Sequence, residues 1–240
     1  MIHPDTILKH ISADIGYGIF ASEFIPAGTI TYVKDELEID IASNHRLLKH
    51  PVYGPLIDKY AYKEPNGRHV IGWDFSKYVN HSCNANTIST GYGFEIAVRN
   101  IQQGEQLTDD YGLFNISRPM PCRCREENCR HTIKPSDVDY YAEDWDYLIK
   151  SALSDLLAVP QPLIELVDTT TYDAIMAYLQ TGKGYQSVRT LKHAANIKAA
   201  GKKPSDEIVL SGVDLDYREL SEGTLVSGGA HQRIVQVDTW

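Results

Sequence analysis

The spacing of the four cysteines predicts a metal site. Cys122, Cys124 and Cys129 form C-x-C-x4-C, and Cys83 lies far upstream. Zn²⁺ favours four tetrahedral ligands and binds thiolate sulfur at about 2.3 Å, so we expect one zinc held by all four cysteines. Four thiolates leave no open position for water or substrate, so this zinc would be structural. The alternative is four unrelated buried thiols in a reduced compartment, which the close grouping of three argues against.

Three other segments combine with this motif into a recognisable order. They are GYG at 16–18, KYVNHSCNAN at 77–86 and EQLTDDYG at 105–112. The first resembles the early G-x-G turn of SET-domain protein methyltransferases, and the second resembles their N-H-S-C signature. The third resembles their E-L-T-x-D-Y segment, and the cysteine motif resembles their post-SET zinc motif. Each motif alone is weak, but four in the family's order are specific, and they cover roughly residues 6–131.

The resemblance implies a mainly β SET fold of small sheets with a knot-like active site, followed by a mostly α-helical C-terminal region. It divides the chain into a SET domain at 1–117, a post-SET zinc knuckle at 118–134 and a helical region of unknown role at 135–240. It also implies that S-adenosylmethionine binds on one face. The target lysine would enter through a narrow channel from the opposite face.

The family's site residues can be carried onto matching positions of this chain. Tyr111 matches the catalytic tyrosine. The cofactor-binding positions are Gly16, Tyr17, Gly18, Asn80 and His81. Taken singly, each has an ordinary structural alternative: a hairpin turn for the glycines, a satisfied core residue for the histidine, a strand tyrosine for Tyr111. Phe114 fits an adenine neighbour and plain core packing equally well.

The implied chemistry is an in-line methyl transfer from a sulfonium to a lysine amine. The amine must be neutral to attack, although its free pKa is about 10.4. The site must therefore help the amine lose a proton and must align it with the methyl group. A phenol oxygen such as that of Tyr111 can accept a hydrogen bond from the amine and orient its lone pair.

Several positions depart from the family pattern. Asp109 stands two residues before the tyrosine, where the family often has an aromatic residue that helps to set how many methyl groups fit. Its carboxyl could bind water, pair with an incoming amine or point away, so the methylation state stays open. Ala85 replaces a proline, and Arg125 replaces a glycine. Tyr32 is the nearest match to a further active-site tyrosine, but its offset is two residues short.

Composition fits an ordinary globular chain and restricts the partners. The 240 residues are 42% hydrophobic and 23% charged, with a formal net charge of −9. This charge argues against coating nucleic acid and suits a basic protein substrate, such as a histone. No run approaches the 18 or so apolar residues of a membrane span, and the N-terminus lacks a signal-peptide pattern. We expect an intracellular, soluble protein with no membrane partner and an unspecified oligomeric state.

The first half reads as short strands separated by turns. GYGIFASEFIPAGTITYV predicts two strands, and GFEIAVRNIQQGEQLTDDYG predicts two more. KYAYKEPNGRHVIGW predicts a hairpin around Asn66-Gly67. Residues 39–56 and 74–79 are weakly helical.

The second half reads as helices. Apolar residues recur at helical spacing from Val138 to Leu156, with Ser136 as the expected cap and Pro160 as the stop. A second helix is predicted at 172–180, ending at Gly182, and a third at 185–200. Short strands are expected within 207–240.

Charged residues on these helices leave two interpretations open. The acidic and aromatic first helix could hold a basic peptide, and the basic residues within 174–205 could contact nucleic acid or an acidic partner. Solvated helix faces are the simpler interpretation of both.

Two rival functions differ in class from a protein-lysine methyltransferase. The first is a catalytically silent SET-like module that binds a partner through its zinc knuckle and helices. The second is a zinc-dependent hydrolase, which the all-thiolate ligand set makes improbable.

Overall fold

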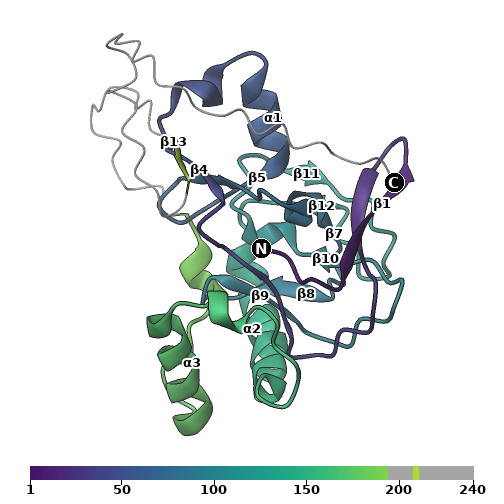
Figure 1. The fold of residues 1–240 in the computed structure, drawn as a ribbon. Coiled ribbons are helices and arrows are strands. Elements are labelled where there is room, and N and C mark those ends of the chain that lie inside the picture. Colours follow the sequence, from purple (N-terminus) through teal and green to yellow (C-terminus); the bar gives the residue numbers. More distant parts are fainter. Residues whose placement is uncertain (194–207, 211–240) are drawn as a thin grey trace, which may run out of the picture.

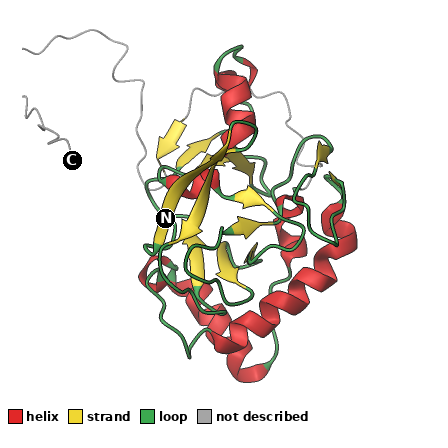
Figure 2. Ribbon diagram, turned by 90° about the vertical axis from the view of Figure 1, so that its right-hand side faces the viewer, coloured by secondary structure: helices red, strands yellow, loops and turns green. Residues whose placement is uncertain are grey.

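The chain forms five small sheets and three α-helices within the residues that the computed structural model describes, 1–193 and 208–210 (Figure 1). Figure 2 shows the strands gathered in the centre, with the longest helix across one side. The predicted order of small sheets followed by helices is confirmed. Within these residues, no helix combines the length and apolar character needed to cross a bilayer.

Two sheets frame the first part of the chain. In the first, β1 (Thr6–Ser12) and β2 (Gly16–Ala21) form an antiparallel hairpin. In the second, β9 (Phe94–Ala97) lies between β3 (Ile30–Val33) and β8 (Thr87–Ser89). The predicted strands on either side of the Pro-Ala-Gly turn therefore exist as β2 and β3. Each pairs with a different partner rather than with the other.

A third sheet contains the predicted Asn-Gly hairpin. Strands β5 (Ala61–Lys63) and β6 (His69–Ile71) pair on either side of the turn, where Gly67 has φ +84°. Next to β6 lie β4 (Ile39–Ile41) and then β13 (Ile208–Leu210). Part of the strand content expected within 207–240 is thus present. The remainder lies outside the described residues.

The weak helical prediction over 39–56 is wrong at its start and is met only in part further along. Its first residues form β4, whose alternate isoleucines suit a strand and pair with β6. The 3₁₀-helix η1 (Arg46–Lys49) and helix α1 (Tyr53–Tyr60) follow. The helical tendency at 74–79 appears as the 3₁₀-helix η2 (Phe75–Tyr78), capped by the Asp74 side chain.

The C-terminal region contains two of the predicted helices. Helix α2 (Asp137–Asp155) matches the long periodic segment, and α3 (Thr169–Thr181) ends at Gly182 in a left-handed conformation. The 3₁₀-helix η4 (Ile164–Leu166) lies between them. The capping expectation is wrong in detail, because the Ser136 side chain makes no cap bond.

The third predicted helix, at 185–200, does not form over its described part. Residues 185–193 contain only the 3₁₀-helix η5 (Val188–Leu191). Tertiary hydrogen bonds replace the helical ladder. The carboxylate of Asp146 accepts from Tyr185 Oη, Ser187 Oγ and Val188 N, and the amide of Asn115 donates to Leu191 O. Residues 194–200 lie outside the described part of the chain.

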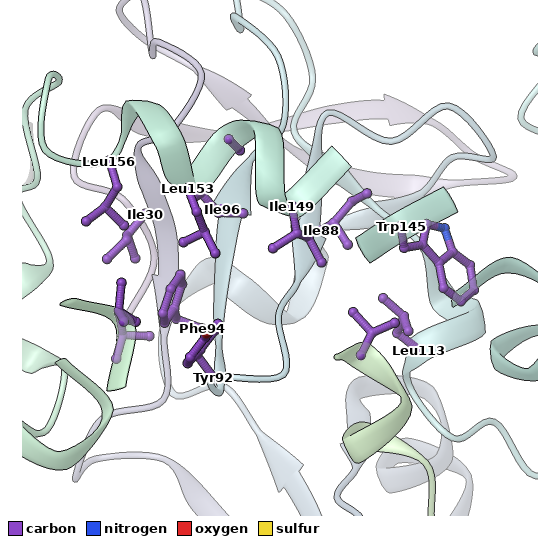
Figure 3. Packing of buried hydrophobic residues seen from close by; sticks show 14 of the residues in the cluster. Ile30, Ile88, Tyr92, Phe94, Ile96, Leu113, Trp145, Ile149, Leu153 and Leu156 are labelled. Atoms are coloured by element: carbon purple, nitrogen blue, oxygen red, sulfur yellow. The ribbon is translucent and has the colours of Figure 1, made fainter. Parts of the chain in front are cut away.

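The main hydrophobic core joins α2 to the β3–β9–β8 sheet (Figure 3). Ile149 and Leu153 of α2, with Leu156 just after its end, project towards this sheet, whereas Trp145 lies beside Leu113. At roughly 25 cal/mol per Å² of apolar area removed from water, such a face dominates the stability of the helix. A second, smaller core lies under the β1–β2 hairpin and includes Ile19, Ile25, Ile101 and Leu107.

Two of the acids expected on a solvated face of α2 are instead buried. Asp137 is 4% exposed and Asp146 is 8% exposed, and both carboxylates are hydrogen-bonded. Tyr140 and Tyr147 do face solvent. The acidic face of α2 is therefore narrower than the sequence pattern indicates.

Candidate active site

The two central signature segments pair with each other. Strand β7 (Asn80–His81) runs parallel to β10 (Thr108–Asp109), with Asn80 opposite Thr108 and His81 opposite Asp109. The bond from Ser82 N to Asp109 O, 3.1 Å long, extends this pairing. Segments almost thirty residues apart in sequence thus lie side by side and present their polar groups together.

Tyr111 lies directly after β10, in the 3₁₀-helix η3 (Tyr111–Leu113). The Asp110 side chain caps this turn by accepting from Gly112 N at 2.9 Å. The phenol of Tyr111 donates to Val79 O at 2.7 Å, and its ring stacks on Phe114 with centroids 5.1 Å apart. Burial, together with the nearby carboxyls of Asp109 and Glu95, raises the pKa of Tyr111. The phenol is therefore neutral, and its oxygen keeps lone pairs for a further hydrogen bond.

His81 connects the Tyr111 turn to the cysteines. Its Nδ1 accepts from Tyr111 N at 3.2 Å, and its Nε2 lies 3.3 Å from Cys83 Sγ. These contacts assign the neutral tautomer with hydrogen on Nε2. Burial lowers the pKa of His81, although the charge of Asp110 opposes this shift. The contacts of His81 thus hold the backbone of Tyr111 and the side chain of Cys83 in position.

The glycine turn and Asn80 come together as expected from their motifs. Asn80 Nδ2 donates to Tyr17 O at 3.0 Å. Gly16 has φ +85°, a conformation that favours glycine. A Cβ on Gly18 would lie 2.9 Å from Asn80 Nδ2 and 2.6 Å from the Ile11 side chain. Both glycines are therefore explained by backbone shape and close packing.

The four cysteines form one cluster. All four Sγ atoms lie within 4.8 Å of one another. The Sγ of Cys122 is 3.8 Å from that of Cys83 and 3.7 Å from that of Cys129. Tetrahedral sulfur ligands about 2.3 Å from zinc are separated by about 3.8 Å. The donor set and its spacing therefore fit a zinc ion.

Backbone geometry around the cluster also suits thiolates. The amides of Cys124, Arg130 and His131 each point at a cysteine sulfur at 3.4 Å. Such N–H donors stabilise metal-bound thiolates from the second shell. Arg125, which stands where the family motif has glycine, adopts φ +64°. This is the left-handed conformation that glycine adopts most easily.

Arg130 connects the cluster with both Tyr111 and α2, a role that sequence reasoning missed. Its Nη2 pairs with Asp110 and its Nη1 with Asp137, the latter at 2.9 Å. Its Nε points at Cys83 Sγ at 3.5 Å, and its guanidinium lies 5.0 Å from the Tyr141 ring centroid. The adjacent carboxylate of Asp110 and the Cys83 sulfur raise the pKa of Arg130 despite its burial. The only sequence signal was an arginine following the last cysteine.

Three cavities meet around Tyr111 and Phe114. The inner cavity, of about 60 Å³, is lined by Tyr32, Tyr60, Ala61, Tyr62, Gly72, Ser76, Lys77, Val79, Glu95, Tyr111 and Phe114. The outer groove, of about 400 Å³, shares Tyr32, Tyr62, Glu95 and Phe114 with it and extends to the η5 segment. The side cavity, of about 390 Å³, shares Ala61, Tyr111 and Phe114 with it and extends along residues 116–121. The inner cavity therefore lies between two larger spaces.

The glycine turn is joined to the inner cavity through aromatic rings. The Tyr17 ring contacts that of Tyr78, with centroids 5.9 Å apart, and Tyr78 contacts Tyr60 at 5.7 Å. Tyr60 in turn lines the inner cavity. Gly16, Gly18, Asn80 and His81 are absent from the lining of the three cavities described above.

Two positions left open by the sequence now have defined surroundings. Tyr32 does line the inner cavity, and its phenol donates to Glu38 Oε1 at 2.9 Å. Asp109 points away from solvent: it is fully buried, and Ser89 Oγ donates to its carboxylate at 2.8 Å. Glu95, which the sequence did not single out, lines the inner cavity together with Tyr111.

Comparison with known proteins agrees with this arrangement. Residues 16–112 match the SET domain family. Over 157 residues the chain is 31% identical to the histone-lysine N-methyltransferase ASHH3 of Arabidopsis thaliana, covering 59% of this chain and 42% of that protein. Over 138 residues it is 39% identical to the histone-lysine N-methyltransferase ash1 of Drosophila melanogaster, covering 52% of this chain and 6% of that protein.

Among solved structures, the methyltransferase domain of human SETMAR aligns with a TM-score of 0.36 and 18% identity, covering 55% of this chain and 58% of that chain. The match to the SET domain thus spans residues 16–112, which contain the glycine turn, the β7–β10 pair and Tyr111. The chain spans less than half the length of the two plant and insect relatives.

Proposed function

We propose that this protein is an S-adenosylmethionine-dependent protein-lysine N-methyltransferase. The observation that carries the proposal is the placement of Tyr111. Its neutral phenol is fixed by Val79 O and borders a small cavity between two larger spaces. A narrow passage with separate openings is what transfer between a cofactor and a macromolecular acceptor requires.

The cofactor side of the site would be formed by Gly16, Tyr17, Gly18, Asn80 and His81. S-adenosylmethionine supplies a methyl group on a sulfonium, which is electrophilic enough to need no catalytic metal. The side cavity adjoins Tyr111, Phe114 and residues 116–121, and its volume is in the range of small-molecule sites. We assign Phe114 to the wall between cofactor and acceptor, because it borders all three cavities.

The acceptor side would be the outer groove. Its walls combine the β8–β9 turn, Lys63–Pro65 and the η5 segment, so the C-terminal region would help to shape the substrate path. Asp146 holds the η5 segment in place through Val188 N at 2.9 Å. The role of the region at 135–240, as far as it is described, is thus to complete this groove.

The Tyr111 phenol would act on the acceptor nitrogen. Because its proton is donated to Val79 O, its oxygen accepts from the amine and turns the amine lone pair towards the methyl group. Alignment of this kind can supply much of the reduction in barrier. The residues Cys83, Cys122, Cys124 and Cys129 would hold one zinc, which fixes the knuckle at 118–134 beside the SET domain at 1–117.

The substrate is proposed to be a basic protein. The two curated relatives are named for histone-lysine methylation, and a net charge of −9 would attract histone tails. A nuclear location would follow from such a substrate. The silent-module alternative is not favoured, since the Tyr111, Val79 and His81 contacts are complete.

The direct test is Tyr111→Phe, assayed with purified core histones and S-adenosylmethionine. We expect kcat to fall on the order of 10²-fold, because a positioned polar group is lost from the transition state. The Kd for cofactor should change little, because the ring still stacks on Phe114. The measurements are single-turnover methylation, cofactor calorimetry and thermal unfolding on one sample.

Tyr140→Phe is the matched control, since it removes an exposed phenol of α2 that lines none of the three cavities. It should leave both stability and turnover unchanged. Near-normal turnover in a stable, cofactor-binding Tyr111→Phe variant would contradict the assignment of Tyr111.

A further inference from the structure

A carboxyl pair lies beside Tyr111 at the junction of the inner cavity and the outer groove. Glu95 is on β9 and lines both spaces, whereas Asp109 is on β10 and fully buried. The two carboxyl groups lie close enough for the charge of Asp109 to act on Glu95, which favours a proton held between them. Ser89 Oγ and Asp110 N also donate to Asp109, so Asp109 is the fixed member of the pair.

Among the described residues that line these two spaces, no cation is paired with either carboxyl. Lys63, in the outer groove, donates to Ser117 Oγ at 3.1 Å. Lys77, in the inner cavity, directs Nζ at the carbonyls of Gly72 and Asp74. Lys34, in the outer groove, is paired with Asp40 and Glu64. The nearby amino group of Met1 is paired with Asp35 and Glu38.

Burial beside a like charge favours retention of protons. The pKa of Glu95 is raised well above its ordinary value, mainly by burial and then by the charge of Asp109. Burial also raises the pKa of Asp109, to about 7. The pair thus keeps at least one proton near neutral pH, so at most one carboxylate faces a single ammonium group.

We propose that Glu95, oriented by Asp109, receives the acceptor ammonium and restricts transfer to a single methyl group. The inference rests on the proposed methyltransferase function and names a residue that the family motifs do not include. It also specifies the acceptor chemistry as a primary ammonium.

The transfer balances with the groups present. The ammonium of the lysine loses one proton to the carboxyl pair and becomes a neutral amine. Its lone pair forms the N–C bond as the C–S bond of the sulfonium breaks. The product is a secondary ammonium and a neutral thioether, and the pair later returns its extra proton to solvent.

The limit to one methyl group follows from hydrogen-bond counting. A neutral primary amine has two N–H groups, one for Glu95 and one for the Tyr111 oxygen, and its lone pair faces the methyl donor. After one transfer, a methyl group must replace one of these donors. A buried oxygen is then left without a partner, which slows the second transfer on the order of 10-fold or more.

A purely steric view gives the opposite expectation. An aspartate at position 109 is smaller than an aromatic residue and would leave room for two or three methyl groups. Glu95 lines the inner cavity beside Tyr111, and under this proposal its charge rather than the cavity volume sets the outcome.

The test compares Glu95→Leu and Glu95→Gln with wild type, using core histones, S-adenosylmethionine and mass spectrometry of the modified lysines. Wild type should yield monomethyl-lysine. Glu95→Leu should raise KM for histone about 10-fold and should produce dimethyl- and trimethyl-lysine. Glu95→Gln keeps size and one acceptor oxygen, so it should weaken binding yet retain the monomethyl product. Glu165→Gln, an exposed acid on η4, is the charge-matched control and should change neither.

A binding arm separates this inference from the proposed function. Histone H3 tail peptides, each with one lysine replaced by norleucine, are titrated into wild type and Glu95→Leu. Wild type should lose about 10-fold in affinity when the acceptor lysine is replaced, and Glu95→Leu should bind the lysine and norleucine peptides equally.

Absence of methyl transfer in wild type, with this discrimination intact, would overturn the methyltransferase proposal alone. Trimethylation by wild type, or an unchanged KM and product in Glu95→Leu, would overturn the role of Glu95. If Glu95→Leu does not fold, Ser89→Ala, which frees Asp109, should show the same changes in smaller degree.

Discussion

The cysteine segment at 118–134 and the helical region at 137–193 support the same turn, η3, by different forces. The cysteine segment has only the two-residue strands β11 (Met120–Pro121) and β12 (Thr132–Ile133), and Ile133 is its one fully buried aliphatic side chain. The helical region buries a continuous apolar face of α2 against the β3–β9–β8 sheet (Figure 3). The cysteine segment is thus held by its sulfur cluster and by ion pairs, whereas the helical region is held by apolar packing.

Both supports reach η3, where Tyr111 lies. From the cysteine segment, Arg130 pairs with Asp110, the residue that caps η3. From α2, Trp145 approaches so closely that a Cβ on Gly112 would lie 2.9 Å from its ring. We therefore expect that loss of the metal disturbs Tyr111 while the hydrophobic core stays intact. Loss of apolar packing should likewise disturb Tyr111 while the metal stays bound.

The largest effect should come from removing the metal. Structural zinc contributes about 10–16 kcal/mol of apparent binding free energy in zinc-finger peptides, and this segment has little apolar core to replace it. Chelation or Cys124→Ser should raise hydrogen exchange across 118–134 while α2 stays protected. Cofactor affinity should fall at least 10-fold, because Cys83 and His81 lie in the same signature segment.

Elemental analysis of freshly purified, reduced protein should give one zinc per chain. Arg123→Ser, an exposed neighbour of two cysteines, is the control and should keep the zinc. Protein without zinc, or exchange that rises equally in α2, would contradict the separation of the two supports.

Ile149→Ala should have a smaller effect, which should be confined to the apolar packing of the helical region. Ile149 is fully buried on α2, and truncation of such a residue costs about 2–5 kcal/mol. Thermal and denaturant unfolding should show this loss, while zinc content stays at one and cofactor Kd changes less than twofold. Leu148→Ala, next to it but 38% exposed, should cost under about 1 kcal/mol. Loss of zinc from Ile149→Ala at a temperature where this variant remains folded would contradict the separation of the two supports.

Elements with a strong local signal could be predicted from the sequence. The Asn-Gly turn gives the β5–β6 hairpin, and helical periodicity with Gly182 as a stop gives α2 and α3. These features depend on neighbours within a few residues, so a single segment contains the information. The η5 segment could not be read this way, because Asp146 and Asn115 replace its helical bonds from far along the chain.

The site shows the same division. Motif order locates the cysteines and Tyr111, whose neighbours in space are other motif residues. Glu95 was missed because a polar residue between Phe94 and Ile96 reads as the solvent side of an alternating strand. Here that side of β9 faces the inner cavity. Arg130 was missed because its partners Asp110 and Asp137 lie in two separate segments that only folding brings together around it.

The smallest effect, and the one that sharpens the comparison most, should come from Arg130→Lys. Lysine keeps the positive charge but cannot contact Asp110, Asp137 and the Cys83 sulfur together, as the planar guanidinium does. Because no buried carboxylate is left without a cation, we expect a loss of about 1–2 kcal/mol, near that of one charge-assisted hydrogen bond. Unlike the two preceding changes, Arg130→Lys should affect both supports: it should lower the unfolding temperature and speed hydrogen exchange across 118–134.

A double-mutant cycle of Arg130→Lys with Asp137→Asn measures the coupling between the two supports and should give about 1 kcal/mol. Arg189→Lys, whose guanidinium meets the exposed Glu143 at 3.6 Å, is the control and should cost under about 0.5 kcal/mol. Additive losses in the cycle would mean that the cysteine segment and the helical region act on Tyr111 independently, and that Arg130 does not join them.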